Sequence, residues 1–134
     1  MQQTPTNACP CGSQRPYRDC CGRYHAGEPA PNAEALMRSR YSAYVLLRHD
    51  YLLATWHAST RPQSLELASP DAVHWLGLSI RSFQPIDDDH AQVEFIARSR
   101  IGGAPATRLH EISRFMREHD RWYYVDGSFP KRAL

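Results

Sequence analysis

The four cysteines of this 134-residue chain gather near its N-terminus as two close pairs, Cys9 with Cys11 and Cys20 with Cys21. Thiolates are soft ligands, and four of them bind Zn²⁺ as a tetrahedron with Zn–S distances of about 2.3 Å. Eight residues separate the pairs, enough for one turn to bring all four sulfurs together. Four thiolates leave no open position for water, so the spacing predicts one structural zinc ion and no metal-based catalysis.

Two disulfides, or four free thiols, are the alternatives for these cysteines. Adjacent Cys20 and Cys21 are poorly placed to form two unstrained bridges, and a reducing compartment disfavours disulfides further. Positive side chains near the cysteines favour the metal, because they can offset the negative charge of four thiolates on one Zn²⁺. These side chains are Arg15, Arg18 and Arg23.

The cysteine pattern also resembles a known motif. Cys9-Pro10-Cys11-Gly12-Ser13, followed by Tyr17 and Cys20-Cys21-Gly22, is similar to the SEC-C motif, the zinc knuckle at the C-terminus of the SecA translocation ATPase. Gln14 stands where the motif usually has glycine, a change that can alter the turn but removes no ligand. In SecA the knuckle contacts the chaperone SecB and the ribosome. The resemblance therefore implies that residues 1–26 form a SEC-C unit that docks on a SecB-like or ribosomal partner.

Composition narrows the classes of protein to which the chain can belong. Its length suits one domain with a short appendage, and 42% apolar residues suffice for a core. No apolar run approaches the roughly 18 residues of a membrane span, so we expect none. Residues 1–8 are polar and read as a disordered lead without a secretory signal, which predicts a cytoplasmic protein. A net charge of +2 is too small to favour nucleic acid.

Two helices are predicted in the first half of the chain. The first runs from Ala33 to about Arg48, with Asn32 as its N-cap. A single apolar stripe at helical spacing supports it, formed by Met37, Tyr41, Tyr44 and Val45. A second, shorter helix is predicted from Tyr51 to about Trp56, with Asp50 as its cap. Residues 27–31 contain two prolines and are interpreted as a stiff linker ahead of both helices.

Beyond Pro70 the period changes to two, which is typical of β-strands. Four strands are predicted, with short turns between them: Trp75–Phe83, Ala91–Ser99, Thr107–Glu118 and Arg121–Val125. Asp126-Gly127 is interpreted as a turn, and Ser64–Leu67 as one short helical turn. Consecutive strands joined by short turns imply an antiparallel meander. The sequence therefore predicts an α+β domain, residues 32–134, in which the helices pack on one face of a curved antiparallel sheet.

Several segments of this larger domain resemble one uncharacterised bacterial family, called YchJ-like. Together they cover nearly the whole chain: 34–44, 51–52, 55–57, 93–95, 110–115 and 122–127. The resemblance implies a cone-shaped fold like that of nuclear transport factor 2, a cystatin-like arrangement, and agrees with helices followed by a meander. It implies no established activity, and a fold by itself does not decide function.

Folds of this shape often enclose a pocket between helices and sheet. Period-two alternation puts Glu111 and Ser113 on one face of their strand and His110 on the other. The predicted pocket draws on helices and strands alike, with Arg38, Arg40, Tyr41, Tyr44, Trp56, Glu111, Ser113, Trp122 and Tyr124. Glu111 and His57 are the candidates for a catalytic general base.

Each candidate also has a purely structural interpretation. An aromatic stripe at helical spacing is more often core than ligand cage. Glu111 is more often half of a buried ion pair, for which Arg38 or Arg40 is the expected partner. His57 at a helix end is more often a cap than a base. The acidic run 87–89 is expected to be a solvated hairpin loop.

Three classes of function follow from these features. The favoured one is a zinc-binding adaptor whose knuckle docks on a protein of the secretion or translation machinery, while the cone domain binds a small ligand or peptide. The second is an isomerase, dehydratase or hydrolase that uses a pocket carboxylate or histidine as general base. The third, nucleic-acid binding through the basic knuckle, has the smallest electrostatic footprint. A cavity holding Glu111 without an Arg partner would favour the enzyme, and a filled core would count against it.

Overall fold

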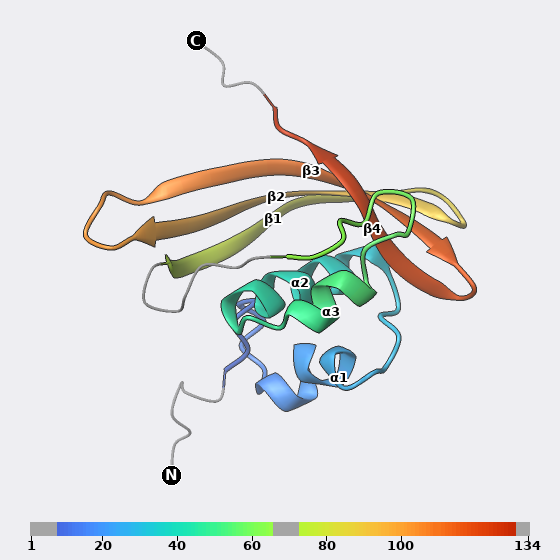
Figure 1. The fold of residues 1–134 in the computed structure, drawn as a ribbon, viewed down its shortest axis with the longest axis horizontal. Coiled ribbons are helices and arrows are strands. Elements are labelled where there is room, and N and C mark those ends of the chain that lie inside the picture. Colours follow the sequence, from blue (N-terminus) through green and yellow to red (C-terminus); the bar gives the residue numbers. More distant parts are fainter. Residues whose placement is uncertain (1–7, 66–72, 131–134) are drawn as a thin grey trace.

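The computed structural model describes residues 8–65 and 73–130, and helices precede a sheet in it (Figure 1). A 3₁₀ turn at Tyr17–Asp19 and the short helix α1 (Cys21–His25) come first. Helices α2 (Ala33–Val45) and α3 (His49–Ala54) follow. Four strands complete the described chain: β1 (Val73–Asp87), β2 (His90–Ile101), β3 (Thr107–Glu118) and β4 (Arg121–Ser128).

The strands form one antiparallel sheet in the order β1-β2-β3-β4. Both longer helices lie on the same face of this sheet, and the long strands curve over them (Figure 1). Three register shifts between β1 and β2 mark β-bulges, which bend and twist the paired strands. Between β3 and β4, His119 and Asp120 both have positive φ, as in the tight turns that match strand twist. The predicted α+β fold, with helices on one face of a curved meander, is confirmed.

The start of α2 follows the sequence prediction. The side chain of Asn32 accepts a hydrogen bond of 2.8 Å from the amide of Ala35, and Glu34 lies in the first turn. Both features stabilise a helix N-terminus, because a capping oxygen satisfies a free amide and a carboxylate opposes the helix dipole. The cap therefore sets where α2 begins, directly after the linker.

The end of α2 and the start of α3 differ from the prediction. Leu47 has a φ of +57°, and the amide of Arg48 donates to the carbonyl of Ala43 at 2.8 Å. This is the hydrogen bond of a Schellman motif, which ends α2 three residues earlier than Arg48. Helix α3 then begins at His49, with Asp50 in its first turn and no capping hydrogen bond. The apolar stripe did not reveal this boundary, because a left-handed leucine has no clear sequence signal.

A bulge in β4 corrects the prediction of a turn at Asp126-Gly127. Both residues lie within the strand, and the register moves from Phe115 opposite Tyr124 to Arg114 opposite Asp126, which leaves Val125 extra. The inserted residue reverses the alternation of side chains beyond it. Tyr124 therefore faces the helices, whereas Asp126 faces outward and pairs with Arg114 at 2.5 and 2.6 Å.

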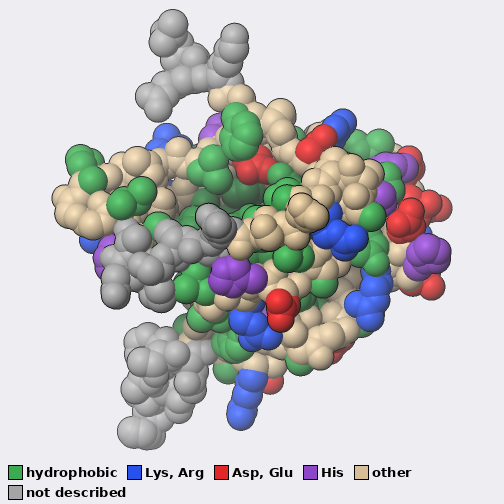
Figure 2. All heavy atoms as spheres, in the orientation of Figure 1, with side chains coloured by type: hydrophobic (Ala, Val, Ile, Leu, Met, Phe, Trp, Pro, Cys, Tyr) green, Lys and Arg blue, Asp and Glu red, His purple; other side chains and the backbone are tan. Residues whose placement is uncertain are grey.

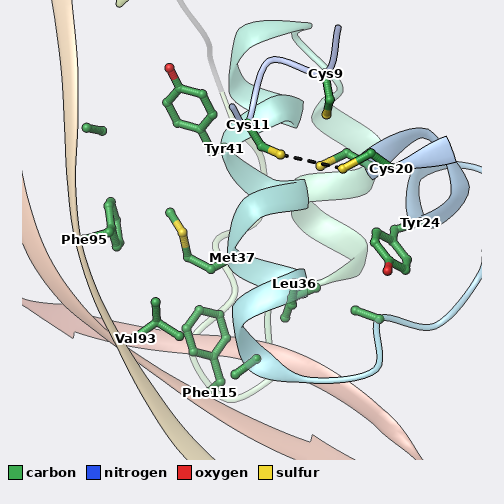
Figure 3. Packing of buried hydrophobic residues seen from close by; sticks show 14 of the residues in the cluster. Cys9, Cys11, Cys20, Tyr24, Leu36, Met37, Tyr41, Val93, Phe95 and Phe115 are labelled. Carbon is green, nitrogen blue, oxygen red and sulfur yellow. Dashed lines mark hydrogen bonds between the residues drawn. The ribbon is translucent and has the colours of Figure 1, made fainter. Parts of the chain in front are cut away.

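The cysteine knuckle, residues 9–22, packs directly against α2. Cysteine sulfurs lie on one side of this helix, and Met37, Phe95 and Phe115 lie on the side that faces the sheet (Figure 3). All of these side chains belong to one continuous buried cluster. The linker is likewise tied down, since Ala30 is buried in the same cluster. The division of the chain into units 1–26 and 32–134 stays a prediction, but the two units share one core.

Two further predictions fall wholly or partly outside the described residues. The disordered lead covers residues 1–8, of which only Ala8 is described, and the helical turn at Ser64–Leu67 is described only as far as Leu65. Within residues 8–65 and 73–130, no helix has the length and apolar character needed to cross a membrane.

Candidate functional site

The four cysteine sulfurs form one compact, buried cluster. Their Sγ atoms all lie within 4.8 Å of one another. Cys11 Sγ and Cys20 Sγ are 3.7 Å apart, close to the edge of about 3.8 Å expected for a tetrahedron with Zn–S bonds of about 2.3 Å. None of the four forms a disulfide. The cluster can therefore hold a metal ion, and a set of four sulfur donors suits a soft or borderline one.

Local backbone conformation explains how so short a segment gathers four thiols. The amide of Cys9 donates to the carbonyl of Arg15 at 2.9 Å, which closes the loop that carries the first pair. Gly12 in this loop has a φ of +86°, which favours glycine. Gly22 is required for another reason, since a Cβ there would lie 2.7 Å from the carbonyl oxygen of Tyr17.

Polar groups surround the sulfurs. The hydroxyl of Ser13 lies 3.1 Å from Cys20 Sγ, and that of Ser42 lies 3.5 Å from Cys9 Sγ. Arg15 donates weakly to Cys20 Sγ at 3.9 Å. The hydrogen bond with Cys11 lowers the pKa of Cys9. The corresponding bond with Cys11 raises the pKa of Cys21.

Of the arginines predicted to offset the thiolates, only Arg15 contacts a sulfur among the described residues. Arg23 instead lies 3.6 Å from Glu28 and over the ring of Tyr24. A different residue, Arg38, supports the cluster from α2 by donating to the carbonyl of Cys11 at 3.1 Å. The sequence does not reveal this contact, because the two residues are 27 positions apart.

A cavity of about 280 Å³ lies between α2 and the inner face of the sheet. Hydrophobic side chains gather around a hollow near the centre of the face shown in Figure 2. Six of the nine predicted pocket residues line the cavity, namely Arg40, Tyr41, Tyr44, Glu111, Ser113 and Tyr124. The remaining lining is apolar, formed by Met37, Trp75, Phe95, Ala97, Leu109 and Phe115. The cone is therefore hollow at this point rather than filled.

Arg40 is a buried cation in this cavity, with 5% of its surface exposed. Its Nη1 donates to the carbonyl of Leu52 at 2.8 Å and to the hydroxyl of Thr55 at 2.7 Å. Its guanidinium lies over two rings, 4.6 Å from the centroid of Tyr124 and 5.1 Å from that of Trp56. Burial lowers the pKa of Arg40. Aromatic faces and neutral acceptors thus hold the charge, and no described carboxylate lies within 4.0 Å of it.

Glu111 is a buried anion on the opposite wall, with 7% of its surface exposed. Its Oε2 accepts hydrogen bonds from the hydroxyls of Ser113 at 2.8 Å and Tyr124 at 3.1 Å. Burial, followed by the charge of Glu111, raises the pKa of Tyr124. The expected ion pair with Arg38 or Arg40 is absent from the described residues, since neither arginine comes within 4.0 Å.

Three predicted pocket residues lie outside the lining. Arg38 is on the knuckle side of α2, where it pairs with Glu34 at 3.2 Å. Trp56 lies behind Arg40, edge-on to Tyr124. Trp122 lies near the start of β4 and lines a second, more polar hollow of about 400 Å³ between α1, α3 and β4. Spacing along one element cannot separate these positions, because it does not show which neighbouring element covers each face.

His57, the second candidate base, lies outside the cavity, and so does His110. His57 follows α3, with its Nδ1 2.8 Å from the hydroxyl of Ser59 and its Nε2 3.2 Å from Glu118 Oε1. His110 lies on the outer face of β3, 2.6 Å from Glu94. The prediction that His110 and Glu111 point to opposite faces agrees with this placement. Among the proposed general bases, only Glu111 borders the cavity.

Sequence reasoning missed one residue that shapes the site, Gly127. A Cβ at this position would lie 2.1 Å from Glu111 Oε2, so the carboxylate occupies the space that any larger residue would need. The sequence feature that could have revealed it is a glycine within a strand pattern, because such a glycine often marks the close approach of another group. The interpretation as a turn concealed it.

Comparison with known proteins places this arrangement among bacterial relatives. Residues 32–127 match the family described as the middle NTF2-like domain of YchJ, and residues 6–23 match the SEC-C motif. A UPF0225 protein of Bordetella parapertussis is 60% identical over 132 residues, which cover 95% of this chain and 98% of the relative.

Two solved structures share the fold. A SEC-C motif containing protein from Rhodopseudomonas palustris superimposes with a TM-score of 0.78 at 36% identity, over 92% of this chain and 99% of that chain. A SEC-C motif containing protein from Psychrobacter arcticus gives a TM-score of 0.76 at 28% identity, over 95% and 85% of the two chains. The fold and the cysteine motif thus occur together in these proteins.

Proposed function

This chain belongs to the YchJ-like family of UPF0225 proteins, and from that premise we propose that it is a zinc-binding adaptor with a ligand-binding cone domain. The cysteine knuckle holds one Zn²⁺ and docks on a protein partner, and the cavity binds a small ligand. One observation carries the ligand-binding part. The cavity contains two buried side chains of opposite charge, Arg40 and Glu111, that form no ion pair with each other.

Zinc is the metal proposed for the knuckle, because a tetrahedral set of four thiolates suits Zn²⁺ or iron. The ion would cross-link the two cysteine pairs, and its thiolate ligands need the reducing conditions of the cytoplasm, where we place the protein. Native mass spectrometry before and after chelation tests this assignment. One zinc per chain, lost on chelation, is expected. A bound iron, or a metal-free chain with two disulfides, would contradict it.

Ligand binding in the cavity is tested with a small apolar probe. Toluene, added to the ¹⁵N-labelled protein, should shift amide resonances of residues that line the cavity, such as Phe95 and Ala97, and leave those of the β2–β3 turn unchanged. Apolar walls surround most of the cavity, so a probe without charge should enter it. Shifts spread evenly over the protein, or none at all, would count against a ligand cavity.

Docking of the knuckle on a protein rests on its similarity to the SEC-C knuckle of SecA. On the knuckle, Arg15 and Arg18 are exposed and not covered by α2. Their positive charges suit an acidic surface on a partner. Sedimentation of the purified chain with purified ribosomes, and titration against purified SecB, test the two partners that the resemblance implies. An Arg18→Glu variant should weaken either complex. No binding to ribosomes or SecB would remove this part of the proposal.

An enzyme is the second candidate, and the unpaired Glu111 favours it. Its Oε1 has no hydrogen-bond partner among residues 8–65 and 73–130 and borders the cavity, where a bound substrate could present a proton. Proton abstraction would exchange a carbon-bound hydrogen of a ligand for deuterium in D₂O. Exchange that is lost in Glu111→Gln would support catalysis, and a bound ligand that keeps all its hydrogens would support the adaptor.

A further inference from the structure

We propose that the cavity selects a zwitterion, namely an α-amino acid with an apolar side chain, whose carboxylate pairs with Arg40 and whose ammonium group pairs with Glu111. This inference rests on the proposed ligand-binding function and names the chemical class of the ligand. Three features of the described residues carry it: two buried opposite charges without ion-pair partners, their closeness, and the apolar walls around them.

Each of the two charges keeps part of its bonding capacity free. Nη1 of Arg40 is satisfied by Leu52 and Thr55, but Nε and Nη2 have no acceptor among the described residues. Oε1 of Glu111 likewise has no donor there. These atoms are not among the fully enclosed polar atoms that lack partners, so each keeps some accessible surface, and both residues line the cavity. An arginine with one free edge is shaped to take a carboxylate through two parallel hydrogen bonds.

Tyr124 shows how close the two charges lie. Its hydroxyl donates to Glu111 Oε2 at 3.1 Å, and the guanidinium of Arg40 lies 4.6 Å from the centroid of the same ring. The two charges therefore border the same tyrosine side chain, with more than 4.0 Å between their nitrogen and oxygen atoms. A molecule that carries a carboxylate and an ammonium group on one carbon atom can bridge two such charges.

Charge balance favours a zwitterion over a simple acid or amine. A carboxylate alone would satisfy Arg40 and leave Glu111 buried without a counter-charge, and an amine alone would do the reverse. A neutral amide could donate and accept at the same positions, but its hydrogen bonds would carry no charge of their own. A ligand with both charges gives each side chain a charged partner and keeps the occupied cavity neutral.

The rest of the cavity suits an apolar side chain. Trp75 lies edge-on to Tyr41 at 5.5 Å between centroids, and Phe95, Leu109 and Phe115 complete the wall. A volume of about 280 Å³ lies just below the roughly 300–1,000 Å³ typical of ligand pockets. The expected ligand is therefore the size of one amino acid with a large apolar side chain.

Titration of the zinc-loaded, ¹⁵N-labelled full chain with L-phenylalanine and L-leucine tests the inference, with the Nε–H resonance of Arg40 as a direct readout. Three analogues remove one charge each: 3-phenylpropanoate lacks the ammonium group, and phenethylamine and phenylalaninamide lack the carboxylate. Each is expected to bind about 10- to 100-fold more weakly than L-phenylalanine, because each loses one hydrogen-bonded charge pair.

Glu111→Gln removes the negative charge of the cavity and leaves the positive charge of Arg40 in place. Its amide oxygen can still accept from Ser113 and Tyr124, so folding should persist, with a Tm unchanged or raised. Binding of L-phenylalanine should fall by about 10- to 100-fold, whereas binding of 3-phenylpropanoate should not fall. Glu94→Gln is the matched control, because Glu94 pairs with His110 on the outer face of the sheet, and it should leave both affinities unchanged.

The outcomes distinguish this inference from the function on which it rests. Equal affinities for L-phenylalanine and its three analogues, or binding of toluene without binding of L-phenylalanine or L-leucine, would overturn the zwitterion and leave a ligand cavity. Failure of toluene and of both amino acids would overturn the inference and the ligand-binding function together.

Discussion

Gln14 is the residue at which this chain departs from the SEC-C motif, and its backbone shows the consequence. It has a φ of +70°, in the left-handed region, and its side chain is exposed. The loop keeps the conformation for which glycine is suited, although a non-glycine residue occupies it. The departure therefore costs stability and leaves the ligand set unchanged.

Gln14→Gly is expected to raise the unfolding free energy of the metal-loaded protein by up to about 1 kcal/mol. Relief of the left-handed conformation gains about 1–2 kcal/mol, and the greater freedom of glycine in the unfolded chain offsets about half of that. Urea titration of both proteins measures the difference. Gln14→Ala is the control and should bring no gain, since alanine keeps the strain. A lower stability for Gln14→Gly would show that the loop is not strained.

Gly127 is the second residue whose lack of a side chain has a structural reason. Gly127→Ala should lower the unfolding free energy by about 1–3 kcal/mol, because the new methyl group would overlap the carboxylate of Glu111. Gly103→Ala is the matched control, since nothing lies within 4 Å of a Cβ there. Thermal unfolding of the two variants measures the difference. Equal melting temperatures would mean that Glu111 can move aside at little cost.

At the scale of elements, α2 is the part on which the others depend. One side faces the sheet, one side carries the knuckle, and a third side contacts α3. This explains why polar residues of α2 are buried. Ser39 bonds with Tyr51, Arg40 with Leu52, and Ser42 contacts Cys9. The hydroxyl of Tyr51 lies 2.7 Å from Ser39 Oγ and, like the bond between Arg40 and Leu52, links α2 to α3.

Tyr51→Phe should lower the unfolding free energy at pH 7 by about 1 kcal/mol, the contribution of one hydrogen bond. The variant should also lose less unfolding free energy than the wild type as the pH rises above 10. Burial raises the pKa of Tyr51 from 10.0 to about 12, so the unfolded chain loses this proton first as the pH rises. The contribution of this phenol is complete below pH 10 and disappears as the pH rises through 12.

Urea titrations of wild type and Tyr51→Phe at several pH values between 7 and 12 check this prediction. Ser39→Ala provides the comparison, because it removes the partner hydroxyl and keeps the phenol of Tyr51. The unfolding free energy of this variant should still fall as the pH rises. Parallel pH curves for wild type and Tyr51→Phe would show that other groups cause the loss.

At the scale of the whole molecule, the knuckle and the cone behave as one packed body. His25 links them, with Nε2 2.8 Å from the carbonyl of Ser39 and Nδ1 2.5 Å from the hydroxyl of Tyr17. Burial lowers the pKa of His25, which favours the neutral ring that can both donate and accept. A stiff linker at residues 27–31, as the sequence predicts, would let the knuckle and the cone fold independently of each other. The shared core changes that expectation.

Removal of the metal is now expected to destabilise the entire chain. Chelation, or Cys20→Ser, should lower the unfolding free energy by about 2–3 kcal/mol, or roughly 8–12 °C in Tm for a chain of this size. Loss of the knuckle would uncover the side of α2 that carries Ser39 and Ser42. Calorimetry should show one transition in both states. A separate early transition, with the main Tm unchanged, would restore the picture of two independent units.

Much of the fold could be predicted from the sequence, because the relevant signals are local. Asn32 marks the start of α2, period-two alternation gives the strands, and the cysteine spacing identifies the cluster that can hold a metal. Glu111 and Ser113 could be assigned to the inner face by alternation alone. Each of these features depends on residues a few positions apart, so the pattern along the chain contains the information.

Only the tertiary structure decided the contents of the cavity. The pairing of Glu111 with Ser113 and Tyr124, the stacking of Arg40 on two rings, and the place of Arg38 beneath the knuckle depend on contacts between distant elements. Alternation also fails beyond Val125, because one inserted residue turns Asp126 outward. Two charges on facing walls can be counted in the sequence, but their separation is set by how the sheet curves over α2.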